Sequence, residues 1–275
     1  MKIAFVGGGN MARAIIGGLV AKGIRASDVT VVEVDGVARL KLVAEFGVTS
    51  VEAVGPELAH AKVVVFAVKP QHMRAAAEAV RGQLSDSPVD DPLVISIAAG
   101  IRLSDLGRWL GGRTRLVRAM PNTPALVHAG ITGLHAAPAV GADDRQAAED
   151  LLAAVGATLW FEREEDLDAV TAVSGSGPAY VFYAMEALER AARELGLAEG
   201  AARSLALWTF VGATKLAIER GEEPAKLRAQ VTSKGGTTER AVDVLDGSGV
   251  QERFVEAVKA ACERSREMGE AFGKE

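Results

Sequence analysis

The chain contains little cysteine, few aromatic residues and no long basic or apolar run. Its single cysteine, Cys262, excludes an intrachain disulfide and is typical of a reducing compartment, so we expect a cytoplasmic location. No apolar run approaches the roughly 20 residues of a membrane-spanning helix, which argues against a membrane partner. The net charge of −5, without basic runs, argues against nucleic acid as a partner. The histidines include no close ligand pair, so no metal site is predicted.

What the chain does have is apolar sequence: its 275 residues are 49% hydrophobic, which suffices for one large core or two domains. The first part alternates short Val- and Ile-rich runs, typical of buried strands, with amphipathic stretches typical of helices. The runs span residues 2–6, 29–33, 63–68, 93–97, 115–119, 131–135 and 158–161. This alternation predicts an α/β fold with a doubly wound parallel sheet, and we expect the last two runs to add antiparallel edge strands.

The pattern changes at a charged segment that begins at residue 162, after which only helical patterns follow. We therefore expect an α/β domain over residues 1–162 and an all-α domain over residues 163–275. Helices are predicted at about 176–195, 201–220, 224–230, 237–245 and 251–270. The second of these is apolar nearly all round over residues 205–213, so it must be covered on most sides. A partner chain is the expected cover, and burial against the first domain is the alternative.

A glycine loop follows the first predicted strand and begins the first helix, with the spacing G-x-G-x-x-A at Gly7, Gly9 and Ala12. The first glycine permits a tight turn, the second lets a pyrophosphate approach the backbone, and the small third residue lets helix and strand pack closely. Asn10 is expected to cap the helix. The loop, including Met11, is therefore predicted to bind a dinucleotide, and a purely structural glycine turn is the alternative.

Glu33 ends the second predicted strand. An acid at this place accepts a hydrogen bond from a ribose 2′-OH and repels a 2′-phosphate, which favours NAD over NADP. Arg39 lies close enough in sequence to complicate this preference, and Asp35 is an alternative acid.

Three later strand ends carry small residues and prolines. These segments are Ala67-Val68-Lys69-Pro70, Ala98-Ala99-Gly100 and the stretch 120–124 around Asn122. Small residues let a flat ring lie against the backbone, prolines hold a loop rigid, and ligands of such sheets bind outside the carboxyl ends of the strands. Together they predict a cofactor crevice, although each segment alone is compatible with ordinary loop chemistry.

A second anion site is predicted near the C-terminus, in the stretch 231–239. Gly235 and Gly236 permit a sharp turn, hydroxyl residues flank them, and a helical pattern begins at once. Backbone N–H groups at a helix start have no partners within the helix, so they suit a carboxylate or a phosphate. A cofactor site and a small-anion site together predict an enzyme that acts on a small acid.

Five motifs occur in a characteristic order over nearly the whole chain. They are Gly-Gly-Gly-Asn-Met-Ala (7–12), Val-Lys-Pro-Gln (68–71), Arg-Ala-Met-Pro-Asn-Thr-Pro (118–124), Ser-Gly-Ser-Gly-Pro-Ala-Tyr (174–180) and Val-Thr-Ser-Lys-Gly-Gly-Thr-Thr (231–238). Together they resemble the motifs of pyrroline-5-carboxylate reductases. The resemblance implies reduction of 1-pyrroline-5-carboxylate to L-proline with NAD(P)H, the last step of proline synthesis.

The resemblance also implies a Rossmann domain followed by a helical dimerisation domain, and hence a homodimer whose dimers assemble further into rings. The small imino acid is the expected substrate. That family often uses NADPH, so Glu33 is a departure that leaves the choice of coenzyme open.

The substrate carboxylate is expected on the N–H groups of Gly236, Thr237 and Thr238, in the turn begun by Gly235 and with help from the Ser233 hydroxyl. By resemblance, Thr238 hydrogen-bonds the ring nitrogen and is the catalytic candidate. A threonine hydroxyl is a weak acid, so Thr238 is expected to orient the imine or relay a proton from water. Helix capping is the alternative role.

Two further segments are expected near the reacting groups. Ser174 and Gly175 are predicted to line the substrate pocket, with a plain helix break as the alternative. Asn122 is predicted to contact the nicotinamide or to close the pocket.

Two rival functions remain at this point. A 3-hydroxyacid dehydrogenase has the same two-domain plan but resembles G-x-G-x-x-x-K at its first long helix, and here Val181 stands in place of the lysine base. A dinucleotide-sensing regulator needs the glycine loop but no carboxylate site, so the intact 231–238 segment argues against it.

Overall fold

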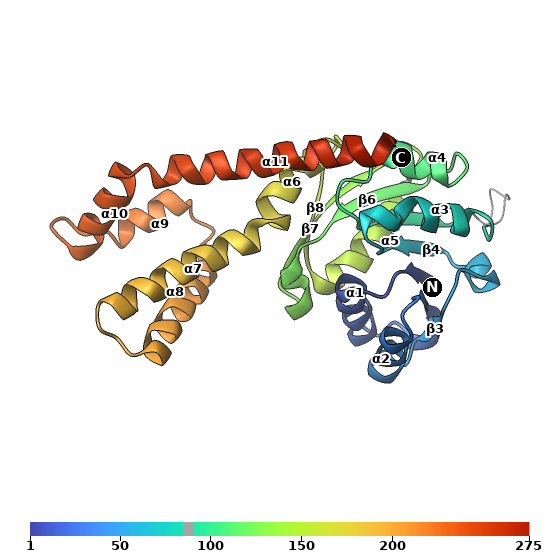
Figure 1. The fold of residues 1–275 in the computed structure, drawn as a ribbon, viewed down its shortest axis with the longest axis horizontal. Coiled ribbons are helices and arrows are strands. Elements are labelled where there is room, and N and C mark those ends of the chain that lie inside the picture. The colour runs from blue at the N-terminus through green and yellow to red at the C-terminus, as the bar shows by residue number, and fades with distance from the viewer. Residues whose placement is uncertain (85–90, 275) are drawn as a thin grey trace. The chain divides into compact units, whose positions relative to one another are not determined.

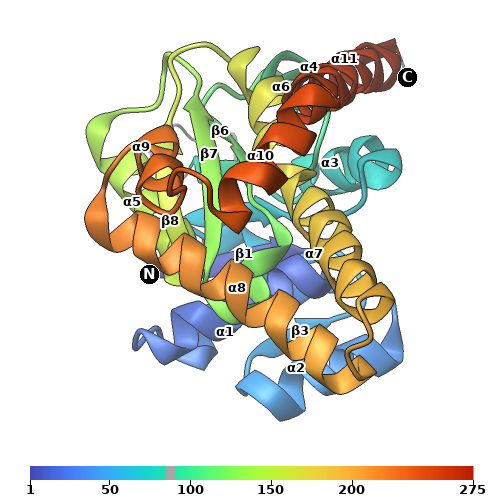
Figure 2. The same cartoon turned by 90° about the vertical axis from the view of Figure 1, so that its left-hand side faces the viewer.

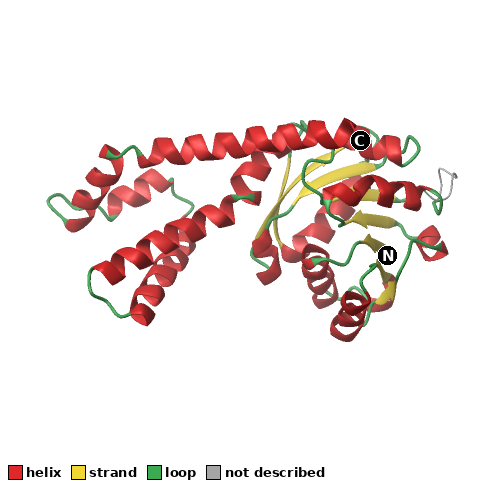
Figure 3. Ribbon diagram, viewed as in Figure 1, coloured by secondary structure: helices red, strands yellow, loops and turns green. Residues whose placement is uncertain are grey.

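The computed structural model describes residues 1–84 and 91–274, so most of the segment 86–92, which the sequence predicts as an exposed loop, lies outside the described residues. The described chain forms two compact units. The first comprises Met1–Ser176 and the C-terminal residues from Ala261 onward, and the second comprises Gly177–Ala260. Strands occur in the first unit, whereas the second is built from helices (Figure 3).

The first unit contains one eight-stranded sheet with the order β3-β2-β1-β4-β5-β6-β7-β8. The strands are β1 (Ile3–Val6), β2 (Val29–Val32), β3 (Thr49–Val51), β4 (Val63–Phe66), β5 (Leu93–Ser96), β6 (Leu116–Met120), β7 (Gly130–Ala136) and β8 (Gly156–Trp160). The first six run parallel; β7 is antiparallel to β6, and β8 runs parallel to β7. The predicted doubly wound sheet with two reversed edge strands is therefore confirmed.

One strand was missed. The β3 strand has only three residues, none of them fully buried, so it lacks the apolar run by which the other strands are recognised. It pairs with β2 at the edge of the sheet, where side chains keep contact with water.

Helices cover both faces of the sheet (Figure 1). They are α1 (Asn10–Ala21), α2 (Gly36–Phe46), α3 (Met73–Arg81), α4 (Leu103–Trp109), α5 (Ala142–Leu152) and α6 (Asp166–Val170). One core contains side chains of α1 and α5, and the other contains side chains of α3 and α4. Strands β1, β4 and β5 contribute to both cores because alternate residues point to opposite faces, which explains their continuous apolar runs.

The second unit is helical: α7 (Gly177–Glu194), α8 (Glu199–Arg220), α9 (Pro224–Gln230), α10 (Thr237–Gly247) and the first part of α11 (Val250–Lys274). Helices α7 and α8 pack against each other (Figure 2). The end of α8 follows the expected chemistry, because Gly221 adopts the left-handed conformation with φ +60° and Pro224 starts the next helix.

The compact units divide after Ser176, whereas the sequence predicts a boundary between residues 162 and 163, ahead of α6. Helix α6 packs against β6 and β7 in the first unit. The last residues of α11 also belong to this unit, where Phe272 packs on the core beside α4.

Candidate active site

The glycine loop joins β1 to α1 in a conformation that requires glycine at its first position. Gly7 has φ +100°, and a Cβ there would lie 2.7 Å from the Ala67 carbonyl oxygen. Gly9 is different, because a Cβ on it would meet no described atom within 4 Å. Packing therefore does not require glycine at position 9. The exposed space in front of it suits the close approach of a ligand's pyrophosphate.

The N-terminus of α1 is open. Gly9 is its N-cap, Asn10 is already the first helical residue, and no side chain caps the helix. The expectation that Asn10 caps α1 is therefore wrong: Asn10 lies inside the helix instead of before it, and its exposed side chain leaves the first amides open. Ala12 is fully buried and Met11 partly buried against the first core, so the helix start is packed closely onto the sheet.

The structure separates the roles of the three charged residues after β2. Both carboxylate oxygens of Glu33 accept backbone N–H bonds, from Gly8 at 2.8 Å and from Asp35 at 2.9 Å. The Asp35 carboxylate caps α2 by accepting from Ala38. Glu33 is therefore the acid that lies against the glycine loop, while Asp35 belongs to the helix.

Arg39 stabilises the turn that follows β2. Its guanidinium donates to the carbonyl oxygens of Glu33 (2.8 Å) and Val34 (2.9 Å) and pairs with Glu52 at 3.3 Å. A group held by three oxygens is less available to a 2′-phosphate than a free arginine. The Glu33 carboxylate thus lies against the glycine loop, and the nearby Arg39 guanidinium is held by other groups of the protein.

The other predicted cofactor residues lie at the same edge of the sheet. Strands β1, β4 and β5 are neighbours, so their carboxyl ends meet there. The Ala67 N–H donates to the Val6 carbonyl at 2.8 Å, which brings the segment of Ala67, Val68, Lys69 and Pro70 beside Gly7. Ala98 follows β5 and is buried, whereas Lys69 is exposed. These residues line the edge as predicted; their contact with a coenzyme stays a prediction.

The Asn122 side chain is buried and bonded to protein backbone. Its Nδ2 donates to the Ser174 carbonyl at 3.1 Å, and its Oδ1 accepts from the Ile131 N–H at 2.9 Å. The structure thus brings two predicted site residues, Asn122 and Ser174, together. Gly175 lies there too, since a Cβ on it would come within 2.6 Å of the Met120 Cε.

Ser174 and Gly175 lie in a π-helical turn, Thr171–Gly175, between α6 and α7. The Ser176 N–H donates to the Thr171 carbonyl at 2.8 Å, five residues earlier, which defines the wide turn. Turns of this type interrupt α-helices frequently at functional sites. The predicted helix break is therefore a widened turn instead of a loop.

The predicted carboxylate site begins α10 in the second unit. Gly235 has φ +73°, Gly236 is the N-cap, and no side chain caps the helix. The capping role considered for Thr238 is therefore absent: Thr238 lies within the first turn. The amides of Thr237 and Thr238 belong to the group at a helix start that has no acceptor inside the helix.

One expectation about this turn is wrong. The Gly236 N–H donates to the Ser233 carbonyl at 3.0 Å, so it closes the turn and is not available to a substrate carboxylate. The Gly235 N–H is also engaged, by the Glu239 carboxylate at 2.7 Å. The sequence could not tell which amides the turn itself uses, and the assignment of the carboxylate site to this segment stays a prediction.

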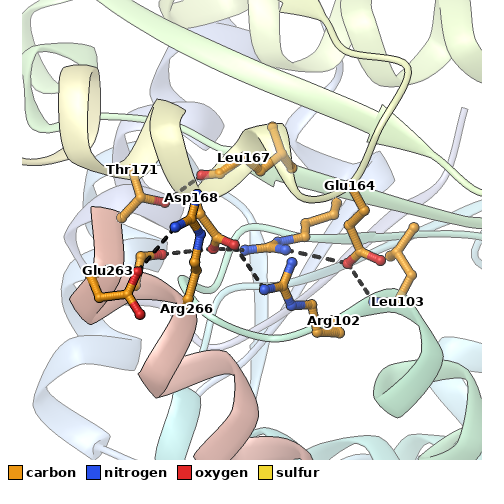
Figure 4. A network of polar contacts seen from close by, with 10 residues as sticks. Arg102, Leu103, Glu164, Leu167, Asp168, Thr171, Glu263 and Arg266 are labelled. Atoms are coloured by element: carbon orange, nitrogen blue, oxygen red, sulfur yellow. Dashed lines mark hydrogen bonds and ion pairs between the residues drawn. The ribbon is translucent and has the colours of Figure 1, made fainter. Parts of the chain in front are cut away.

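A buried polar network that the sequence did not predict lies in the first unit (Figure 4). Asp168 of α6 accepts hydrogen bonds from Arg102 and from Ser265 of α11, each at 2.8 Å, and lies 3.6 Å from Arg118 of β6. Glu164 accepts from the Leu103 N–H at 2.8 Å and pairs with Arg118 at 3.3 Å. Asp168, Arg118 and Ser265 are each less than a twentieth exposed.

Arg118 is only 1% exposed, so its charge carries a desolvation cost. Burial lowers the pKa of its guanidinium below the ordinary value, and the charges of Glu164 and Asp168 oppose that effect. An arginine inside an apolar strand run was the available signal, since arginine is almost never buried without a partner. The network ties β6, α6 and α11 together.

Within residues 1–84 and 91–274, no group of histidine, cysteine, aspartate and glutamate residues has the geometry of a metal site. Among the same residues, no helix has the length and apolar character needed to cross a membrane.

An open helix N-terminus behind a glycine loop, at the carboxyl edge of a parallel sheet, together with a helical unit, defines a dinucleotide-dependent oxidoreductase of two-unit design. The comparisons with known proteins then identify the family. Residues 164–268 match the family model for pyrroline-5-carboxylate reductase dimerisation, and residues 2–100 match the model for NADP oxidoreductase, coenzyme F420-dependent.

Curated relatives match over the full length. The chain is 43% identical to pyrroline-5-carboxylate reductase of Pseudomonas aeruginosa, over 99% of this chain and 98% of that protein. A solved pyrroline-5-carboxylate reductase of Coxiella burnetii is 40% identical with a TM-score of 0.91, over 97% and 98% of the two chains. A solved pyrroline carboxylate reductase of Plasmodium falciparum, with NADP bound, is 26% identical with a TM-score of 0.84, over 98% of each chain. The chain belongs to the pyrroline-5-carboxylate reductase family.

Proposed function

We propose that the protein reduces 1-pyrroline-5-carboxylate to L-proline with NAD(P)H, the last step of proline biosynthesis. The observation that carries the assignment is the 43% identity, over 99% of this chain, to pyrroline-5-carboxylate reductase of Pseudomonas aeruginosa. The two rival functions lose their support, because residues 164–268 match the family model for pyrroline-5-carboxylate reductase dimerisation.

The substrate carboxylate is proposed to bind at the start of α10. Its partners are the amides of Thr237 and Thr238 and the hydroxyl of Ser233, while Gly235 and Gly236 form the turn. Two observations support this: the N-terminus of α10 has no side-chain cap, and a Cβ on Gly236 would collide with the Ser233 hydroxyl at 2.6 Å. An uncapped helix start favours an anion through its free N–H groups and the helix dipole.

The reaction places a hydride on the imine carbon and a proton on the nitrogen. NAD(P)H supplies the hydride when bound. Thr238 is proposed to hold the ring nitrogen through its hydroxyl and so to fix the orientation of the imine. A protonated imine is already a good electrophile, so orientation of the substrate provides most of the catalysis.

We propose that the coenzyme preferred by this chain is NADH. The Glu33 carboxylate is fixed against the glycine loop and favours a free ribose 2′-OH, while Arg39 is held by two carbonyl oxygens and Glu52. The Plasmodium falciparum relative holds NADP, so the preference is proposed for this chain and not for the family.

The protein is a homodimer, and a ring of dimers is proposed as its larger assembly. The cytoplasmic location expected from its single cysteine stays a prediction.

The experiment that tests the function is a rate comparison of NADH and NADPH oxidation, with and without 1-pyrroline-5-carboxylate. Substrate-dependent oxidation with formation of proline, faster with NADH, is the expected result. No substrate-dependent oxidation with either coenzyme would refute the assignment, whereas a faster rate with NADPH would refute the coenzyme preference alone.

A further inference from the structure

Alternate residues of β6 and its extension form a series of contacts with the helical segment that leads to Ser174. Arg118 lies 3.6 Å from Asp168, and Met120 lies against Gly175. Two positions further, Asn122 donates to the Ser174 carbonyl at 3.1 Å. Residues spaced by two share one face of an extended chain, and Asn122 is still extended, with φ −127° and ψ 165°.

The π-turn that carries Ser174 is held partly by its own hydroxyl groups. The Thr171 hydroxyl donates to the Leu167 carbonyl at 2.7 Å, and the Ser174 hydroxyl donates to the Val170 carbonyl at 2.9 Å. A π-turn leaves some carbonyl groups outside the regular helical pattern. The bond from Asn122 occupies the Ser174 carbonyl and joins this turn to β6.

Both polar atoms of the Asn122 side-chain amide form hydrogen bonds within the protein. Its oxygen is held by the Ile131 N–H and its nitrogen by the Ser174 carbonyl, and the residue is 8% exposed. A ligand of the nicotinamide needs a polar atom that faces the coenzyme, whereas this side chain links three backbone segments of the same unit. Asn122 is therefore better suited to hold these backbone segments together than to bind the coenzyme.

We propose that Asn122 is a positioning residue for the imino-acid substrate and not a ligand of the coenzyme. It holds the Thr171–Gly175 turn against β6 and thereby fixes Ser174, which the sequence predicts to line the substrate pocket. The inference rests on that function, since the substrate named here is the one proposed above.

The test is the variant Asn122→Asp, which keeps an acceptor for the Ile131 N–H but replaces the donor to Ser174 with a carboxylate oxygen. Loss of one buried hydrogen bond corresponds to roughly a tenfold effect. We expect the KM for 1-pyrroline-5-carboxylate to rise about tenfold, while the dissociation constant of NADH, measured by fluorescence titration, stays unchanged. Asn122→Ser keeps a small hydroxyl donor, so its KM for 1-pyrroline-5-carboxylate is expected to lie between those of Asn122→Asp and the wild type. It replaces Asn122→Asp in the test if the aspartate variant does not fold.

Ser265→Ala is the matched control. It removes a 2.8 Å hydrogen bond to Asp168 at the other end of the same series of contacts, without touching the π-turn. It is expected to lower the melting temperature and leave the KM for the imino acid unchanged.

Three results would overturn the inference: a raised dissociation constant of NADH in Asn122→Asp, an unchanged KM for the imino acid, or the same change of KM in Ser265→Ala. Failure of the proposed function is distinct, because it would appear as no imine reduction by the wild-type protein. The NADH titration still decides in that case whether Asn122 binds the coenzyme.

Discussion

The two compact units of this chain differ in what they bury. In the first unit, helices cover both faces of an eight-stranded sheet over two apolar cores. In the second, α7, α9 and α10 contain no fully buried residue, and α8 buries only Ala202 and Ala206. Large apolar side chains stay exposed there, among them Tyr183 at 74% and Trp208 at 68%.

This difference shows that one unit has a complete core and the other does not. Large apolar side chains that stay exposed in one region of a protein mark an interaction site when they form a contiguous patch. The dimerisation model covers this region of the chain, so the partner subunit is the expected cover, as the apolar run 205–213 predicts. The proposed carboxylate site thus lies in the unit that depends on assembly.

The largest expected effect is on the complete core. Phe66 of β4 is fully buried, and Phe66→Ala should reduce the free energy of unfolding by about 3–5 kcal/mol, because it removes buried apolar surface and leaves a cavity. Urea denaturation followed by circular dichroism measures this loss. The difference from the wild type should be the same at every protein concentration. A loss that varied with concentration would mean that the first unit also depends on the partner.

The next effect concerns catalysis in the second unit. Thr238→Ala should reduce turnover by about 10- to 1000-fold while the protein stays folded and dimeric, as for a lost transition-state hydrogen bond. Thr237→Ala is the control, since it loses a hydroxyl but keeps the amide proposed for the carboxylate. Steady-state rates with saturating NADH measure both. Equal rates for the Thr238 variant and the wild type would remove Thr238 from the mechanism.

The third effect tests whether the exposed apolar side chains of the second unit form the dimer interface. Trp208→Ala should weaken the dimer by about 2 kcal/mol or more, because buried tryptophans dominate interfaces. Lys215→Ala in the same helix, where the lysine forms an exposed ion pair with Glu219, should change the dimer little. Sedimentation over a range of concentrations measures dissociation. An unaffected dimer in Trp208→Ala would place the interface elsewhere on the second unit.

The smallest effect concerns the coenzyme and lies wholly in the first unit. Glu33→Gln should shift the ratio of kcat/KM values about tenfold toward NADPH, because a carboxylate repels a 2′-phosphate. Asp35→Asn removes a neighbouring negative charge but keeps the cap of α2, so it should leave the ratio nearly unchanged. The same shift in both variants would indicate a long-range effect of charge and not recognition of the ribose by Glu33.

The sequence predicted the parts of this molecule that local patterns determine. Glycine and proline set the turn at Gly7 and the helix boundaries at Gly221 and Pro224, and apolar runs marked all strands except β3. The segments of the candidate site also follow from motifs, and the contacts Asn122 makes with Ser174 and Ile131 bring two of them together.

Features that depend on tertiary contacts could not be predicted. The Arg118–Asp168 network joins residues far apart in sequence, and neither residue has a local pattern that names its partner. Two local details also escaped prediction. The bond from the Gly236 amide to Ser233 depends on the exact backbone turn, and the place of Asn10 in α1 depends on where the helix begins.

A crystal structure of the dimer with L-proline and oxidised coenzyme would test the central claim most directly. The account predicts that the proline carboxylate accepts hydrogen bonds from the backbone amides of Thr237 and Thr238, with the ring nitrogen at the Thr238 hydroxyl. A carboxylate bound away from the start of α10 would contradict it.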